Sequence, residues 1–366
     1  PIPSYLIALA VGDLESREVG PRSRVWSEPS VIDAAALEFK ETENILLAAE
    51  HICGPYVWGR YDMLVLPPSF PYGGMENPCL AFVSDTTLAA DRPFAPVVAH
   101  EVALSWMGNL ITNATWEDFW MNAGFAVFVE RKIISRVFGR NKADIKASMG
   151  HERLKAAIAH LGKDHPFTKL HIDMDNVDPD DSFSDIPYEK GYAFLCYLEK
   201  LVGGPSVFEP FLQTHVQRFQ YGMVDIKEWK NFFLAYFKDN KAVDHIDWEA
   251  WIYGTGWPPH ICEINNTHVL TPRVAAEEYY AYGCLKNLNF DGAWTSDQKV
   301  VFLEKLLDLI DSGSHLHSFT AQVMQELDSR NNFSKSMNSE IRFRWYLLGI
   351  KIENENVFDD ARQFLL

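Results

Sequence analysis

The sequence lacks a long apolar segment, an excess of positive charge and a regular pattern of cysteines. It contains no run of roughly 18 uncharged apolar residues, the length that a membrane-spanning helix needs. We also recognise no signal peptide at its start. The formal net charge of −17 argues against nucleic acid and against an anionic membrane as partners. The sequence therefore predicts neither a membrane protein nor a nucleic-acid-binding protein.

The cysteines are odd in number and widely spaced, and no C-x-x-C pair occurs among them. They are Cys53, Cys79, Cys196, Cys262 and Cys284. This spacing is typical of reduced thiols, so we expect a cytoplasmic protein. The chain also begins at Pro1 without an initiator Met, which leads us to expect a fragment or a trimmed form of a longer protein.

Apolar residues are abundant, and their spacing predicts a largely helical protein. The sequence is 47% hydrophobic with 11 Trp and 24 Phe, enough to form buried cores, and 366 residues favour two domains. We expect β-structure over residues 4–12, 61–67 and 80–83. From about residue 205 onward the apolar spacing is almost entirely helical. The proline-rich piece at 257–272 is the best candidate for a linker.

One apolar run, expected to be helical from Val97 to Leu110, contains most of a zinc peptidase motif. His100 and Glu101 are followed by Leu104, where H-E-x-x-H requires a second histidine. In the complete motif, imidazoles at i and i+4 lie on one helix face and bind zinc, while the Glu acts on the attacking water. The dipeptide alone has little specificity, because a second one occurs at His151-Glu152. Taken alone, it favours a helix that carries chance polar residues.

Other stretches of the chain carry a specific resemblance to a known family. They are Pro55-Tyr-Val-Trp-Gly, Leu64-Val-Leu-Pro-Pro-Ser-Phe-Pro-Tyr-Gly-Gly-Met-Glu-Asn-Pro-Cys, Ser105-Trp, Gly108-Asn-Leu, Phe119-Trp, Glu130-Arg, His165-Pro-Phe-Thr-Lys-Leu, Asp178-Pro-Asp, Pro187-Tyr-Glu-Lys-Gly and Asn338-Ser-Glu-Ile-Arg-Phe-Arg-Trp. With these motifs the chain resembles the gluzincin zinc aminopeptidases, specifically the branch of leukotriene A4 hydrolase and aminopeptidase B. The resemblance covers nearly the whole chain.

The resemblance implies a mostly α fold with three parts. Residues 1–12 would be a remnant of the family's N-terminal β-saddle domain. Residues 13–257 would form a thermolysin-like catalytic domain, with a small mixed sheet and helices. Residues 258–366 would be part of the helical C-terminal domain. The family's basic residues that hold a peptide's carboxylate lie further along that helical domain, and no matching segment occurs in this sequence.

The resemblance also places the zinc ligands of the family at three positions of this chain. They fall on His100, Leu104 and Ala123, the last because Asn122-Ala123-Gly124 stands where the family has N-E-G. Leucine and alanine carry no donor atom, and a catalytic zinc takes three protein ligands. Only a remnant of the metal site is therefore expected at His100, and we predict no cofactor.

Most other site positions of the family are retained. The resemblance implies Glu101 as general base, Tyr188 as the oxyanion-stabilising phenol, Glu130 as a support for a zinc histidine, and Gly73, Gly74, Met75, Glu76 and Asp180 as residues of the substrate cleft, with Phe183 in place of a second tyrosine. Simpler interpretations remain for several of them. Tyr188 could be only a buried phenol, Gly73-Gly74 only a tight turn and Glu76 only a loop carboxylate.

The favoured hypothesis is an inactive pseudopeptidase that keeps a cleft for peptides. Two alternatives stay open. The chain could be an active zinc aminopeptidase, with epoxide hydrolase activity as an option, that uses substitute ligands. It could also be an interaction module that binds a protein partner through its helical tail.

Overall fold

The computed structural model describes residues 1–88, 95–286, 294–313 and 318–365. The chain divides into two compact units. The first comprises Pro1–Asp85 and Ala95–Ile264, and the second comprises Thr86–Phe94 and Asn265–Leu366. Within the described ranges, no helix is long and apolar enough to cross a bilayer.

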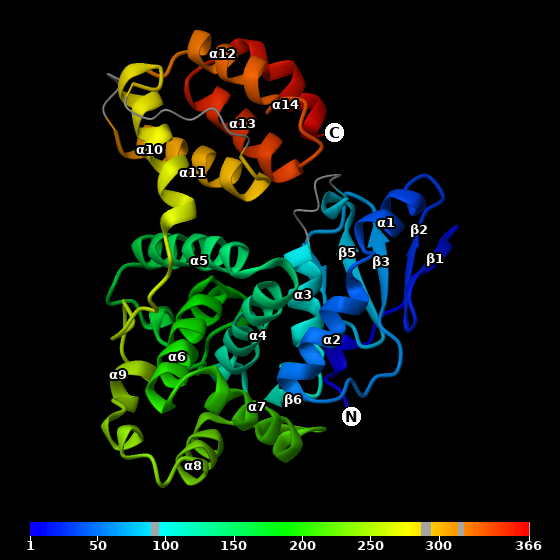
Figure 1. Cartoon of the computed structure of the whole chain (residues 1–366), viewed down its shortest axis with the longest axis vertical. Helices are drawn as coiled ribbons and strands as arrows, with labels where there is room; N and C mark the ends of the chain where they lie inside the picture. The colour runs from blue at the N-terminus through cyan, green and yellow to red at the C-terminus, as the bar shows by residue number, and fades with distance from the viewer. Residues whose placement is uncertain (89–94, 287–293, 314–317, 366) are drawn as a thin grey trace. The chain divides into compact units, whose positions relative to one another are not determined.

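A five-stranded mixed sheet lies in the first unit. Its strands are β1 (Glu15–Gly20), β2 (Ser23–Ser27), β3 (Asp62–Leu66), β4 (Gly74–Met75) and β5 (Leu80–Ser84), in the order β1-β2-β3-β5-β4. β3 is parallel to both β2 and β5, whereas β1 and β4 pair antiparallel at the two edges. Met63, Leu64 and Val65 of β3 are all buried, as a central parallel strand requires. Helices α1 (Ile32–Glu38) and α2 (Thr42–Cys53) pack against the sheet (Figure 1).

A helical layer forms the rest of the first unit. Its helices are α3 (Ala95–Leu104), α4 (Trp120–Phe138), α5 (Arg140–Leu161), α6 (Ile186–Val202), α7 (Pro205–Phe219), α8 (Ile226–Tyr236) and α9 (Trp248–Ile252), with a small parallel pair of strands, β6 (Ile111–Asn113) and β7 (Gly222–Val224). α4 is the central helix and packs against α2, α3, α5 and α6. Every residue from Trp120 to Val129 is buried, which fits a helix that is apolar on all sides.

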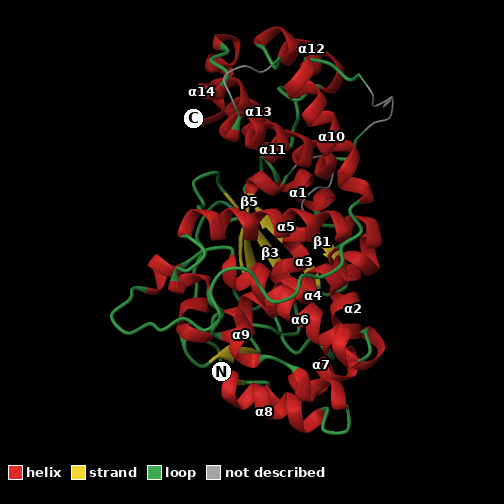
Figure 2. Ribbon diagram, turned by 90° about the vertical axis from the view of Figure 1, so that its left-hand side faces the viewer, coloured by secondary structure: helices red, strands yellow, loops and turns green. Residues whose placement is uncertain are grey.

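The regular secondary structure among the described residues of the second unit is helical, with loops between the helices (Figure 2). It contains α10 (Thr267–Tyr282), α11 (Ser296–Ser312), α12 (Ala321–Asn331), α13 (Ser339–Lys351) and α14 (Phe358–Leu365). α11 packs against α10 and α13. Phe333 stacks between Phe302 and Trp345, with ring centroids 6.2 and 4.9 Å away, and these rings form the core of the unit.

The expected fold class is confirmed, since the chain is mostly helical with a small mixed sheet. Two local predictions are wrong. Residues 4–12 form a short 3-10 turn and irregular backbone instead of a strand, and Ile7, Leu9 and Val11 are exposed, because no neighbouring strand pairs with them. The helix expected to reach Leu110 ends at Leu104. Gly108, at φ +148°, adopts a backbone conformation that a helix does not allow.

Candidate functional site

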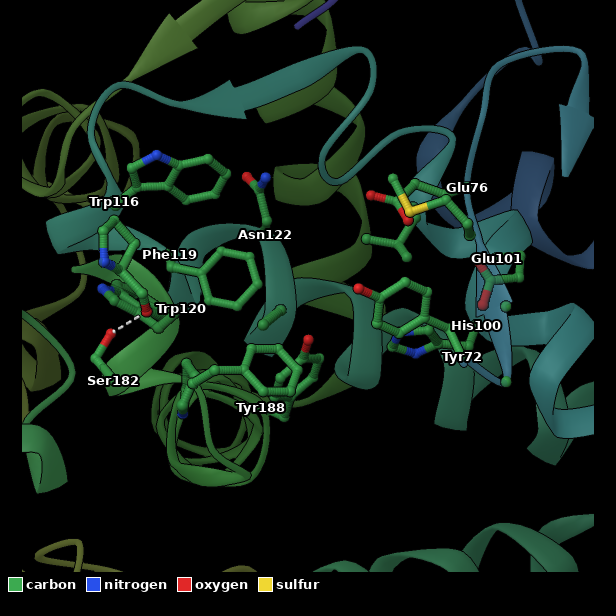
Figure 3. Close-up of a pocket in the computed structure, with 18 of the residues that line it drawn as sticks. Tyr72, Glu76, His100, Glu101, Trp116, Phe119, Trp120, Asn122, Ser182 and Tyr188 are labelled. Atoms are coloured by element: carbon green, nitrogen blue, oxygen red, sulfur yellow. Dashed lines mark hydrogen bonds between the residues drawn. The ribbon is translucent and has the colours of Figure 1, made fainter. Parts of the chain in front are cut away.

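One cleft in the first unit gathers every residue that the resemblance assigns to the site. It has a volume of about 740 Å³. Its lining includes Gly73, Gly74, Met75, Glu76, His100, Glu101, Leu104, Ala123, Glu130, Asp180, Phe183 and Tyr188. These residues come from the loop around β4, from α3, from α4, from the segment before α6 and from the first turn of α6 (Figure 3).

Two glycines explain how α4 and α6 bring their residues to this cleft. A Cβ atom added to Gly124 of α4 would lie 2.7 Å from the Cα of Gly191, and one added to Gly191 would lie 2.8 Å from the Cα of Gly124. The backbones of the two helices therefore touch, which only glycine allows. This crossing lies one residue from Ala123 and one helical turn from Tyr188.

Buried ion pairs hold α6 against its neighbours. Arg131 of α4 donates from Nη2 to both carboxylate oxygens of Glu189, at 2.8 Å each, and Arg153 of α5 donates to Glu189 at 2.8 Å. The fully buried Lys190 donates from Nζ to the backbone carbonyls of Thr168, Gly254 and Gly256 at 2.7–3.0 Å. Charge-assisted hydrogen bonds of this kind are the strong ones, so the start of α6 is firmly positioned.

His100 is surrounded by carboxylates. Its Nδ1 lies 2.9 Å from Oε2 of Glu130. Glu130 is therefore placed where a carboxylate that orients a zinc-binding histidine would lie. Burial lowers the pKa of the imidazole, but Glu130, Glu101 and Glu76 together outweigh burial and raise the pKa to about 9. The imidazole is thus held as a cation beside Glu130, whose pKa is lowered in spite of burial by its hydrogen bond to His100.

Glu101 is buried beside the glycine loop. Its side chain is 4% exposed, and its Oε2 has no hydrogen-bond partner among the described residues. Burial raises the pKa of the carboxyl group to about 8. A Cβ atom at Gly74 would lie 2.2 Å from Oε1 of Glu101, so the glycine is what lets the loop approach the carboxylate.

Apolar side chains occupy the other two positions that the resemblance assigns to zinc ligands. Leu104 is 9% exposed and Ala123 is 1% exposed, and both line the cleft with His100. Within the described ranges, no group of three or more His, Cys, Asp or Glu side chains is arranged to hold a metal ion. A catalytic zinc needs three protein donors, so the residues present do not fit the zinc of the family.

Glu76 and Tyr188 provide further polar groups of the cleft. Burial raises the pKa of Glu76, and the backbone carbonyl of this residue accepts a hydrogen bond of 2.7 Å from Asn109. The ring of Tyr188 lies 6.2 Å from that of His100 and packs edge-on against Phe183. Burial also raises the pKa of the Tyr188 phenol, which keeps this group protonated as a hydrogen-bond donor.

Several residues that line the cleft were not identified from the sequence. They are Tyr5, Trp116, Lys146 and Arg153. The ring of Tyr5 lies 5.5 Å from that of Trp116. Burial raises the pKa of this phenol to about 12, and Glu76 contributes to the shift. Nothing near Tyr5 in the sequence marks it, because its position depends on contacts with segments far along the chain.

Family models match most of the chain. A peptidase family M1 domain matches residues 36–251, and the C-terminal domain of leukotriene A4 hydrolase matches residues 294–366. Leukotriene A-4 hydrolase from Xenopus laevis is 43% identical over 359 residues, which are 98% of this chain and 58% of that relative. Aminopeptidase B from Homo sapiens is 39% identical over 382 residues, with 100% of this chain and 57% of the relative covered.

Solved structures agree with these matches. The structure of yeast LTA4 hydrolase in complex with Bestatin has a TM-score of 0.92 and 33% identity, and the match covers 100% of this chain and 61% of that one. The chain thus spans less than two thirds of the length of the relatives that it matches. Together, the matched models, the relatives and the site geometry lead to one conclusion: the chain belongs to the peptidase M1 family, in the branch of leukotriene A4 hydrolase and aminopeptidase B.

Proposed function

We propose that this chain is a pseudopeptidase, which binds peptides in the cleft of its family without a catalytic metal. One observation carries the proposal. Leu104 and Ala123 present only carbon atoms to the cleft beside His100, at the two positions where the family has zinc ligands. Without a metal, a bound water keeps its ordinary pKa near 15.7 instead of about 7, so Glu101 has no activated water to work with.

The retained polar residues support peptide binding. The loop from Gly73 to Glu76 lies along the cleft, and the Glu76 carboxylate is the group that would receive the α-amine of a peptide. Tyr188 stays protonated at neutral pH and can donate a hydrogen bond to a peptide carbonyl. A free peptide amine would favour the ionised form of Glu76, because a nearby positive charge lowers the pKa of a carboxyl group that burial has raised.

Calorimetry with a short peptide tests binding. Tri-alanine with a free amine should bind, and N-acetyl-tri-alanine should bind about 10–100-fold more weakly, because a hydrogen bond to a charged group contributes about 1.5–3 kcal/mol. Glu76→Gln should remove that preference. Glu117→Gln is the matched control, because Glu117 lines the same cleft outside the loop. Equal binding of both peptides, or none at millimolar concentration, would contradict the proposal.

An aminoacyl-anilide assay with added zinc tests the loss of activity. We expect no turnover above that of the Glu101→Gln variant. Turnover that disappears in this variant would favour the alternative of an active zinc aminopeptidase with substitute ligands.

The proposal includes a cytoplasmic location, since the cysteines are odd in number and widely spaced. Cell fractionation with an antibody against the chain measures this directly.

A further inference from the structure

One face of α5 supplies positive charge to the cleft. Lys146 and Arg153 are the only residues that α5 contributes to the described lining, and both are basic. Residues seven positions apart lie two turns apart on the same face of a helix, about 10 Å along its axis. The acidic residues of the lining come from other segments of the chain. The cleft therefore has basic groups that are separate in origin from its carboxylates.

Arg153 is held in place by two carboxylates near the start of α6. Its Nη2 donates to Oε1 of Glu189 at 2.8 Å, and its Nε lies 3.4 Å from Oδ1 of Asp185. A guanidinium has five N–H groups in a rigid planar fork, so these two contacts leave N–H groups for a further acceptor. The side chain of Arg153 is 50% exposed and lines the cleft, so a ligand in the cleft can reach it.

The two carboxylates leave Arg153 able to attract another anion. Glu189 is shared, because both of its oxygens also accept from Nη2 of the buried Arg131 at 2.8 Å each. Asp185 lies further from Arg153 and is half exposed, so solvent weakens this second pair. A carboxylate of a ligand could therefore form a charge-assisted hydrogen bond with Arg153 without displacing either partner.

The size of the cleft suits a ligand that carries both charges. A peptide of three residues spans at most about 10–11 Å when it is fully extended. The cleft volume of about 740 Å³ lies within the range of pockets that enclose small ligands. A short peptide has an amine at one end, for which Glu76 is the proposed partner, and a carboxylate at or near the other end.

We propose that Arg153 binds a carboxylate of the ligand, so that the cleft selects short peptides with an anionic group beyond their free amine. Lys146 adds a second positive charge to the same lining. The carboxylate is either that of the peptide C-terminus or that of an acidic side chain, since both have the same chemistry. This inference rests on the proposed function, because it concerns the peptide that the cleft would bind.

Calorimetry with the folded full chain compares tri-alanine with tri-alanine amide, which lacks the C-terminal carboxylate. The amide should bind about 5–30-fold more weakly, a smaller factor than for a buried pair because Arg153 is half exposed. Raising the salt concentration from about 0.05 M to about 0.5 M should reduce this difference, because salt screens exposed charges. Ala-Ala-Glu-amide distinguishes the two sources: it binds as tri-alanine does if the subsite takes a side-chain carboxylate, and as the amide does if it takes only the C-terminal one.

The Arg153→Gln variant tests the assignment to this residue. It should bind tri-alanine and tri-alanine amide equally, and should still prefer a free amine to an N-acetyl group. Arg140→Gln is the matched control and should keep the preference for the carboxylate, because Arg140 belongs to the same helix and pairs with Asp144 at 2.9 Å but does not line the cleft.

The outcomes separate this inference from the proposed function. Equal binding of tri-alanine and its amide by the unsubstituted chain, with the preference for a free amine intact, would overturn this inference alone. A preference for the carboxylate that persists in folded Arg153→Gln protein would overturn it as well. Absence of binding by all of these peptides would overturn it together with the proposed function.

Discussion

Restoring the two missing donors tests whether the cleft still has the geometry of a metal site. In the Leu104→His plus Ala123→Glu variant, two imidazoles would lie one turn apart on α3, and a carboxylate would project from α4 into the same cleft. Two imidazoles and one carboxylate form a donor set that catalytic zinc uses. Glu130 already bonds to His100 and would orient it toward the metal.

The burial of positions 104 and 123 determines how much the two substitutions change the free energy of unfolding. Ala123 is 1% exposed and Leu104 is 9% exposed, so larger polar side chains must be accommodated without water. Overpacking costs about 1–3 kcal/mol, and an unpaired buried polar group adds about 1–3 kcal/mol. Without metal, we expect the variant to be less stable than the unsubstituted chain by about 2–6 kcal/mol. Zinc at 100–1,000 times its Kd should return about 2.7–4.1 kcal/mol.

Urea unfolding in the presence of a chelator measures the loss of stability, and urea unfolding with excess zinc measures the stability that zinc restores. Mass spectrometry gives the number of zinc ions bound per chain. The unsubstituted chain should not respond to zinc. Each single variant has one donor too few and should bind zinc far more weakly than the double variant. A folded double variant that binds no zinc would refute the reasoning, because the positions assigned to the ligands would then not converge.

Three further variants test the packing that builds the cleft. Burial lowers the pKa of His215 to about 3, so its neutral form is required in the folded state. The unfolded state takes up a proton below about pH 6.5, so lowering the pH from 7 to 5 should cost about 2 kcal/mol of stability through this residue. His215→Phe should lose less stability over the same pH range, and equal pH profiles in urea unfolding would contradict this account. Gly124→Ala forces apart α4 and α6, whose backbones touch, and should lower the free energy of unfolding by about 1–3 kcal/mol. An unchanged free energy of unfolding in calorimetry would mean that the two helices separate freely. Lys190→Met leaves three backbone carbonyls without their donor and should lower the free energy of unfolding by about 3–5 kcal/mol. A melting temperature within 2 °C of that of the unsubstituted chain, which corresponds to roughly 1 kcal/mol, would show that water replaces the lysine.

The sequence predicts the fold best where one helix face or one strand determines it. β3 is a largely apolar segment, and it forms where that pattern places a strand. Residues 4–12 show that an apolar run alone does not make a strand, because a strand also needs a neighbour with which to pair. The early end of α3 follows from Gly108 and from the bond between Asn109 and the loop at Glu76, neither of which periodicity detects.

The candidate site was predictable only as far as its motifs extend. The resemblance identifies the positions of His100, Leu104 and Ala123, and all three line one cleft. Tyr5 and Arg153 line the same cleft but belong to no motif. Their place depends on the docking of distant segments, which no local pattern in the sequence encodes.

The zinc content of the purified chain tests the central claim most directly. Protein expressed with zinc in the medium and purified without chelators should contain far less than one zinc per chain when it is measured by inductively coupled plasma mass spectrometry. A content close to one zinc per chain, lost on His100→Ala substitution, would contradict the account.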